Sequence, residues 1–144
     1  HEGCQHSIRD IQGEQLMIEI TFSKIAEELF KVARKWASLN GLEIRDVLTP
    51  LRGPNIIIAF PLKDGRTLEA FINADDDKQT FDTIYTFITP DGKSGVRLMG
   101  TSHEVPFITG DNKADAIRTL FLIKNEILLV RDEANLLKRD ENIH

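Results

Sequence analysis

The feature that most constrains the fold is a run of short β-type segments joined by tight turns between Gly41 and His103. Segments rich in β-branched and aromatic residues lie at 42–48, 55–60, 67–72, 82–88 and 96–99. Asp-Gly pairs in the intervening segments 63–66 and 90–95 favour hairpin turns, because Gly readily adopts positive φ. Strands joined by such short turns must be antiparallel. The sequence therefore predicts an antiparallel sheet of about five strands, roughly 42–102.

An acidic segment at 73–79 interrupts these strands, and it partly matches a calcium-binding loop. Asn73, Asp75 and Asp77 would occupy the first, third and fifth ligand positions of an EF-hand. The sixth position is Lys78 where Gly is required, however, and the twelfth is Ile84 where a bidentate Glu is required. We therefore interpret the segment as a solvated loop, and we predict no metal site and no cofactor.

A long amphipathic helix is predicted before the strands, at about 23–39. Ser23 is a suitable N-cap, and Asn40-Gly41 is a typical helix end. Apolar residues at alternating spacings of four and three form a heptad-like row that begins further upstream. The row comprises Ile11, Gln15, Ile18, Phe22, Ile25, Leu29, Val32, Trp36 and Leu39, of which only Gln15 is polar. For 14–22, an extension of the helix and a short strand remain open alternatives, because Ile18, Ile20 and Phe22 also alternate at period two. Residues 1–12 are expected to fray.

A second long helix is predicted at about 112–137, with Asp111 as its N-cap. Its main apolar stripe contains Ala116, Leu120, Ile123, Ile127, Val130, Ala134 and Leu137. Phe121, Leu122, Leu128 and Leu129 widen this stripe until it almost encircles the helix. A helix of this kind must be covered on more than one side. The polar end at 138–144 is expected to fray, and 1–144 is predicted to be a single α+β domain.

Composition narrows the class of protein. A chain of 144 residues with 41% hydrophobic and 28% charged residues is typical of one soluble domain. The net charge of −5 argues against nucleic-acid binding, which requires a basic surface. The longest apolar stretches are too short to cross a membrane. Cys4 is the only cysteine, so an intramolecular disulfide is excluded and a cytoplasmic location is expected.

Catalytic motifs are not evident in the sequence. Gly92-Lys93-Ser94 ends like a phosphate-binding loop, but the upstream Gly is replaced by Ile88. His103, beside Glu104, is the only histidine outside the chain ends. An enzyme would have to combine His103 with Asp75, Asp77 or Asp82, and a surface histidine without a catalytic role is the favoured interpretation.

We therefore expect a non-enzymatic protein-interaction module, of an adaptor, chaperone-like or regulatory kind. In its gross features, which are small size, acidity and two helices around antiparallel strands, the chain is similar to secretion-chaperone-like and adaptor domains. The excess apolar surface of the last helix predicts a homodimer, with room for another protein partner. The candidate interface residues are Phe121, Ile123, Leu128, Val130 and Trp36.

The alternative hypothesis is a small-molecule-binding domain. A curved sheet closed by a long helix can enclose an apolar cavity between the two. The candidate cavity residues are Phe60, Phe71, Tyr85, Phe87 and Leu98. A core filled by these same side chains is the competing interpretation.

Overall fold

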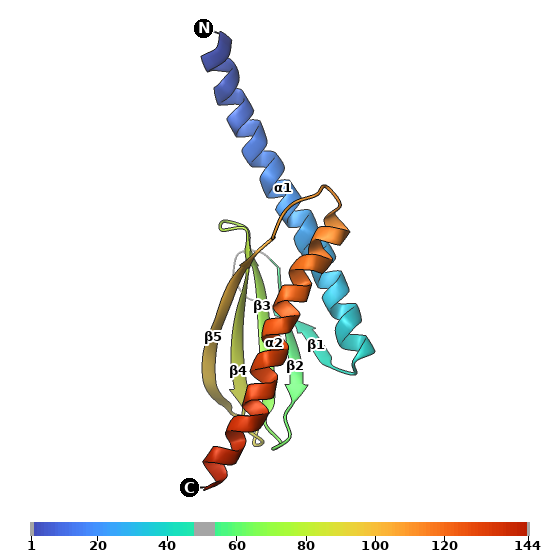
Figure 1. The fold of residues 1–144 in the computed structure, drawn as a ribbon, viewed down its shortest axis with the longest axis vertical. Coiled ribbons are helices and arrows are strands. Elements are labelled where there is room, and N and C mark those ends of the chain that lie inside the picture. Colours follow the sequence, from blue (N-terminus) through green and yellow to red (C-terminus); the bar gives the residue numbers. More distant parts are fainter. Residues whose placement is uncertain (1, 48–53, 144) are drawn as a thin grey trace.

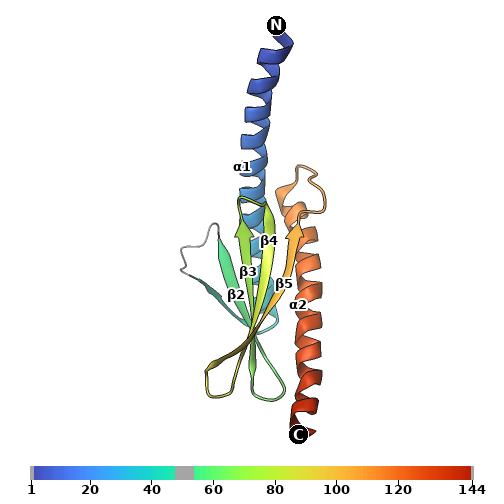
Figure 2. The same cartoon turned by 90° about the vertical axis from the view of Figure 1, so that its left-hand side faces the viewer.

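The computed structural model describes residues 2–47 and 54–143. The chain forms α1 (Glu2–Leu39), β1 (Glu43–Asp46), β2 (Asn55–Pro61), β3 (Thr67–Asp75), β4 (Thr80–Ile88), β5 (Ser94–Glu104) and α2 (Asn112–Ile143). The five strands make one sheet in the order β1-β2-β3-β4-β5, and every neighbouring pair is antiparallel. Both helices lie on the same face of this sheet (Figures 1 and 2). The predicted α+β arrangement is therefore confirmed.

Alternation along the central strand separates the two faces of the sheet. On β3, Leu68, Ala70 and Ile72 are fully buried beneath the helices, whereas Phe71 points to the opposite face and is only partly buried. This is the period of two that a pleated strand imposes. Cross-strand register places Ile57, Phe71, Ile84 and Met99 in one row on the face opposite the helices.

The acidic segment is shorter than predicted, because β3 continues to Asp75 and β4 begins at Thr80. The Asp75 carboxylate accepts hydrogen bonds from the backbone N–H groups of Asp77 and Lys78. Gln79 closes the turn with a φ of 57°. The segment expected to be a loop thus contracts to a tight turn, since Asp75 satisfies the turn's own backbone donors.

α1 begins at Glu2, well before the predicted start at residue 23. The structure decides between the two alternatives for 14–22 in favour of helix, and residues 2–12 are helical where fraying was expected. Gly13 does not end the helix, since a glycine in an exposed helix costs only about 1 kcal/mol relative to alanine. The side chains of Ile11, Gln15 and Ile18 lie outside those that the structure describes. At the other end, Leu42 N–H bonds the Ala37 carbonyl at 2.8 Å, with Gly41 at a φ of 65°.

α2 begins after Asp111, whose carboxylate accepts a hydrogen bond from Ala114 N–H at 3.1 Å. This confirms the predicted N-cap. Asp115, in the first turn, is fully buried and accepts hydrogen bonds from the backbone N–H and hydroxyl of Thr109. Arg118 pairs with Asp115 and stacks over Phe107, 4.5 Å from the ring centroid. The loop between β5 and α2 is therefore held against the helix by polar and aromatic contacts.

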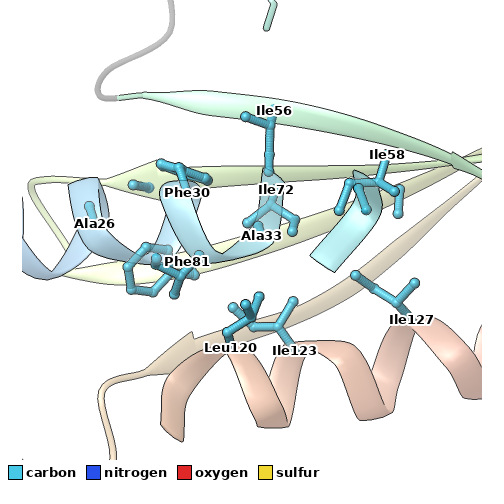
Figure 3. Packing of buried hydrophobic residues seen from close by; sticks show 14 of the residues in the cluster. Ala26, Phe30, Ala33, Ile56, Ile58, Ile72, Phe81, Leu120, Ile123 and Ile127 are labelled. Atoms are coloured by element: carbon cyan, nitrogen blue, oxygen red, sulfur yellow. The ribbon is translucent and has the colours of Figure 1, made fainter. Parts of the chain in front are cut away.

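The core lies between the sheet and the two helices (Figure 3). Phe81 of β4 packs against Phe22 of α1, with ring centroids 5.1 Å apart. α2 contributes Leu120, Ile123 and Ile127, which are buried in the same cluster. One stripe of each helix therefore covers one face of the sheet, which is the usual way that both element types bury their apolar sides.

Candidate interaction surface

The outer side of α2 carries large apolar side chains that the rest of the described chain does not cover. Leu122 is 42% exposed, Leu129 is 63% exposed and Leu136 is 66% exposed. Ile117 and Phe121 are also about half exposed. Contiguous exposed apolar side chains mark interaction sites on a protein surface. We call Leu122, Leu129 and Leu136 the leucine row.

The leucine row has the spacing of a helix-packing seam. Its members are seven residues apart, and seven residues make almost two complete helical turns. The three side chains therefore stay in line along the helix axis and drift by only about 20° per step. Such a line supplies one of the two positions per heptad by which one helix packs lengthwise against another, and the positions between its members, Asn125 and Asp132, are polar.

The structure places the five candidate interface residues in different environments. Phe121 is 58% exposed on the outer side of α2. Ile123 is fully buried in the core, and Leu128 and Val130 pack partly against it. Trp36 lies between the layers. Its ring centroid is 6.1 Å from that of Phe60, and the Lys124 ammonium lies 5.4 Å from the Trp36 ring centroid. Of this set, Phe121 is the one that the structure puts on the surface.

The structure also separates the candidate cavity residues. Phe60 and Tyr85 are buried beneath the helices, and Phe87 packs partly against the same core. Phe71 lies on the opposite face of the sheet, because it alternates with the buried Ala70 and Ile72. Leu98 pairs with Tyr85 in register but is 47% exposed at the sheet edge. The five side chains therefore do not converge on one cavity.

A second unpartnered apolar feature lies at the β5 edge of the sheet. β5 is 11 residues long and forms one end of the strand order. Val96 is 72% exposed and Met99 is 70% exposed. The other edge strand, β1, has only four residues, three of them charged. Short charged edges resist pairing with another strand, whereas a long edge leaves more unpaired backbone groups available for it.

The main polar cluster lies between α2 and the last two strands, around Glu126. Its carboxylate accepts hydrogen bonds from the hydroxyls of Thr83 and Tyr85 on β4. Thr101 N–H, on β5, donates to Glu126 Oε1 at 2.9 Å, and His103 Nε2 lies 3.2 Å from the same oxygen. Each carboxylate oxygen thus accepts two hydrogen bonds, so the usual acceptor sites of an ionised Glu are all occupied.

Gly100 makes room for this cluster. A Cβ atom at this position would lie 1.9 Å from Thr83 Oγ1 and 2.9 Å from Glu126 Oε2. β5 is irregular here, because the register with β4 shifts between Asp82 and Ile84. The bulge and the missing side chain together allow the Glu126 carboxylate to reach the backbone of β5.

The cluster strongly favours the ionised form of Glu126. Burial acts to raise the pKa of Glu126, but hydrogen bonds from His103, Thr83, Tyr85 and Thr101 outweigh it and hold this pKa well below its ordinary value. Burial, together with the neighbouring carboxylate, raises the pKa of the Tyr85 phenol far above its usual range. At neutral pH the cluster is therefore a fixed carboxylate surrounded by donors, which joins the middle of α2 to β4 and β5.

Sequence reasoning identified His103 but not its partner. His103 bonds Glu126, 23 residues away, and not the adjacent Glu104, whose side chain is exposed. Asp82 lies beside Ser102 in register, on the face of the sheet opposite His103. Asp82 pairs instead with Lys78, at 3.1 Å. Two pairs of polar residues are each spaced two apart, Thr83 and Tyr85 on β4, and Thr101 and His103 on β5. This spacing would have indicated that polar side chains collect on the helix-facing side of these two strands.

Other potential binding features are less developed. A surface pocket at the C-terminal end of α2 involves Pro61, Lys63, Arg131, Asp132, Asn135 and Leu136. Among the side chains that the structure describes, no group of three or more from His, Cys, Asp or Glu is arranged to hold a metal ion. Over the described residues, neither helix combines the length and apolar character needed to cross a membrane.

Comparisons of this chain with protein-family models, with curated proteins and with solved structures found no match.

Proposed function

We propose that this protein is a non-enzymatic protein-interaction module that associates with itself through the exposed side of α2. The observation that carries the proposal is the leucine row, Leu122, Leu129 and Leu136, at 42–66% exposure on a helix whose opposite side fills the core. Fully burying an exposed leucine side chain contributes about 1.5–3 kcal/mol. Because these leucines are 42–66% exposed, burying the remainder of each contributes about half of that. Three leucines from each of two copies therefore contribute about 5–10 kcal/mol, which supports a reversible helix–helix contact.

The Glu126 cluster supports a structural role for the polar residues. The carboxylate already accepts bonds from four groups, and its low pKa makes it a poor proton acceptor at neutral pH. A catalytic carboxylate instead needs a pKa near the working pH and a free site for substrate. We assign the cluster the task of fixing α2 on the sheet, so that the leucine row is presented on a rigid element.

Sedimentation velocity or light scattering over a wide concentration range tests the proposal. We expect a reversible monomer–dimer equilibrium, which Leu122→Gln/Leu129→Gln weakens by about a hundredfold or more. The reason is that each substitution occurs in both copies, and every 1.4 kcal/mol lost changes the dissociation constant tenfold. Glutamine keeps helix propensity and charge, so the monomer fold is retained.

Leu39→Gln is the matched control, since Leu39 is 77% exposed on α1, away from the leucine row. It should leave the dissociation constant unchanged. The proposal fails if the natural chain is monomeric at every concentration, or if the control weakens the dimer as much as the double variant does.

A further inference from the structure

We infer that the partner on α2 is a second copy related by a two-fold axis beside Met99 and Leu129, so that the two α2 helices pack antiparallel and the two β5 edges meet. This inference rests on the proposed function and specifies its geometry. It joins the leucine row and the apolar β5 edge, two unpartnered features of the described chain, in one interface.

The two features lie on the same side of the molecule. Glu126 bonds Thr101 and His103, so the Glu126 side of α2 faces β5. Leu122 precedes Glu126 by four residues and Leu129 follows it by three. Residues three and four apart are neighbours on a helix surface. The leucine row therefore runs along the flank of α2 that is nearest to the β5 edge, which Figure 2 shows beside α2.

The centres of the two features also lie at the same level. Met99 is the middle residue of β5, and Leu129 is the middle member of the leucine row. From the Thr101–Glu126 hydrogen bond, Met99 is two residues back along β5, or about 6.6 Å. Leu129 is three residues forward along α2, or about 4.5 Å. β5 and α2 run in opposite directions, so both steps lead toward the same end of the molecule (Figure 1).

A single two-fold axis at this level satisfies both features. It brings Leu129 against its own copy and Leu122 against the partner's Leu136, because these residues are equally far from the axis. It also brings Asn125 level with the partner's Glu133, which pairs an amide donor with a carboxylate acceptor. The self-complementary, antiparallel arrangement is the isologous contact expected of a homodimer.

The β5 edges complete this interface. Arg97–Met99 is the stretch between the two irregularities in the pairing of β5 with β4, and an axis at Met99 sets its first residue level with the partner's Thr101. Backbone groups on the outer side of an edge strand can pair with an antiparallel strand, and a two-fold axis at Met99 supplies one. The sheet of one copy would then continue into the sheet of the other, with the paired α2 helices covering the junction.

Cysteine cross-linking tests the register. In a Cys4→Ser background, we introduce Leu122→Cys, Leu129→Cys or Leu136→Cys, and Leu39→Cys serves as the control. Disulfides require Cα atoms within about 7 Å, so they report close contacts. We expect Leu129→Cys to cross-link with itself, and a mixture of the Leu122→Cys and Leu136→Cys chains to give mainly the mixed disulfide by mass spectrometry. Self-cross-linking of Leu122→Cys in preference to the mixed product would overturn the antiparallel register.

Met99→Lys tests the contribution of the strands. It should raise the dimer dissociation constant tenfold or more, because two ammonium groups would meet at the axis, while Leu39→Lys leaves that constant unchanged. Amide hydrogen exchange in 94–104 should also slow with rising protein concentration. If the monomer of Met99→Lys is unstable, Val96→Lys takes its place. A dimer that is weakened by Leu122→Gln/Leu129→Gln, but shows neither strand effect nor the expected disulfides, would overturn this inference and leave the proposed function intact. A chain that is always monomeric would overturn both.

Discussion

Replacing Glu126 with glutamine should destabilise the fold by about 2 kcal/mol at neutral pH. The carboxylate accepts hydrogen bonds from Thr83, Tyr85, Thr101 and His103. Bonds to a charged acceptor contribute about 1.5–3 kcal/mol each, against about 0.5–1.5 kcal/mol for a neutral one. Four bonds therefore lose about 1 kcal/mol each, and about half of that total is offset because a neutral amide is less costly to bury.

Urea denaturation followed by circular dichroism measures this loss. A change of about 2 kcal/mol corresponds to a decrease in Tm of about 4–8 °C for a chain of this size. Glu27→Gln is the control, since it makes the same chemical change at an exposed position of α1, outside the proposed interface. Its effect on the free energy of unfolding should stay within about 0.5 kcal/mol.

The pH dependence of the unfolding free energy provides a second test of the Glu126→Gln substitution. The pKa of Glu126 in the folded chain lies below its ordinary value of 4.5. Its contribution to stability is therefore fully present above about pH 5, and is lost as the pH falls below 4.5 toward the folded-state pKa. The difference in unfolding free energy between the natural chain and Glu126→Gln should shrink over that acidic range. A difference near zero at pH 7, or one that grows on acidification, would refute the assignment of Glu126 as an ionised anchor.

Two further substitutions test the packing. Gly100→Ala should lower the free energy of unfolding by at least about 1–3 kcal/mol in thermal or urea denaturation, because its Cβ would lie 1.9 Å from Thr83 Oγ1. Gly13→Ala, in an open helical position, is the control and should be neutral or stabilising. Equal effects of the two substitutions would contradict the close approach at Gly100. Ile123→Ala should lower the free energy of unfolding by about 2–5 kcal/mol, since Ile123 is fully buried, and a loss below about 1 kcal/mol would be inconsistent with its place in the core.

Local sequence was enough to predict most of the secondary structure. The hairpins at Gly65 and Gly92 both use positive φ at a glycine, and the Asp111 cap and the Gly41 helix end are present as predicted. These features depend on a few adjacent residues and on the steric freedom of glycine or the short reach of an aspartate. The antiparallel arrangement followed because turns that short cannot connect parallel strands.

Helix length was harder to predict than helix position. α1 begins at Glu2, because Gly13 and the polar upstream residues weaken a helix without preventing its continuation. Ile18 and Phe22 fit the helical spacing of four, and Ile18, Ile20 and Phe22 also fit the strand period of two. A local pattern cannot distinguish a helix from a strand over so few residues.

Tertiary structure decided which apolar residues of α2 belong to the core and which to the surface. By itself, the sequence determined that the stripe was too wide for one packing partner. It could not separate Ile123, which is buried, from Leu129, which is exposed, because both are aliphatic and only the direction of the sheet distinguishes them. In the same way, the sequence presented His103 beside Glu104, whereas the fold joined it to Glu126. Contacts between residues distant in the chain depend on how the layers pack, and that information is absent from local patterns of hydrophobicity and charge.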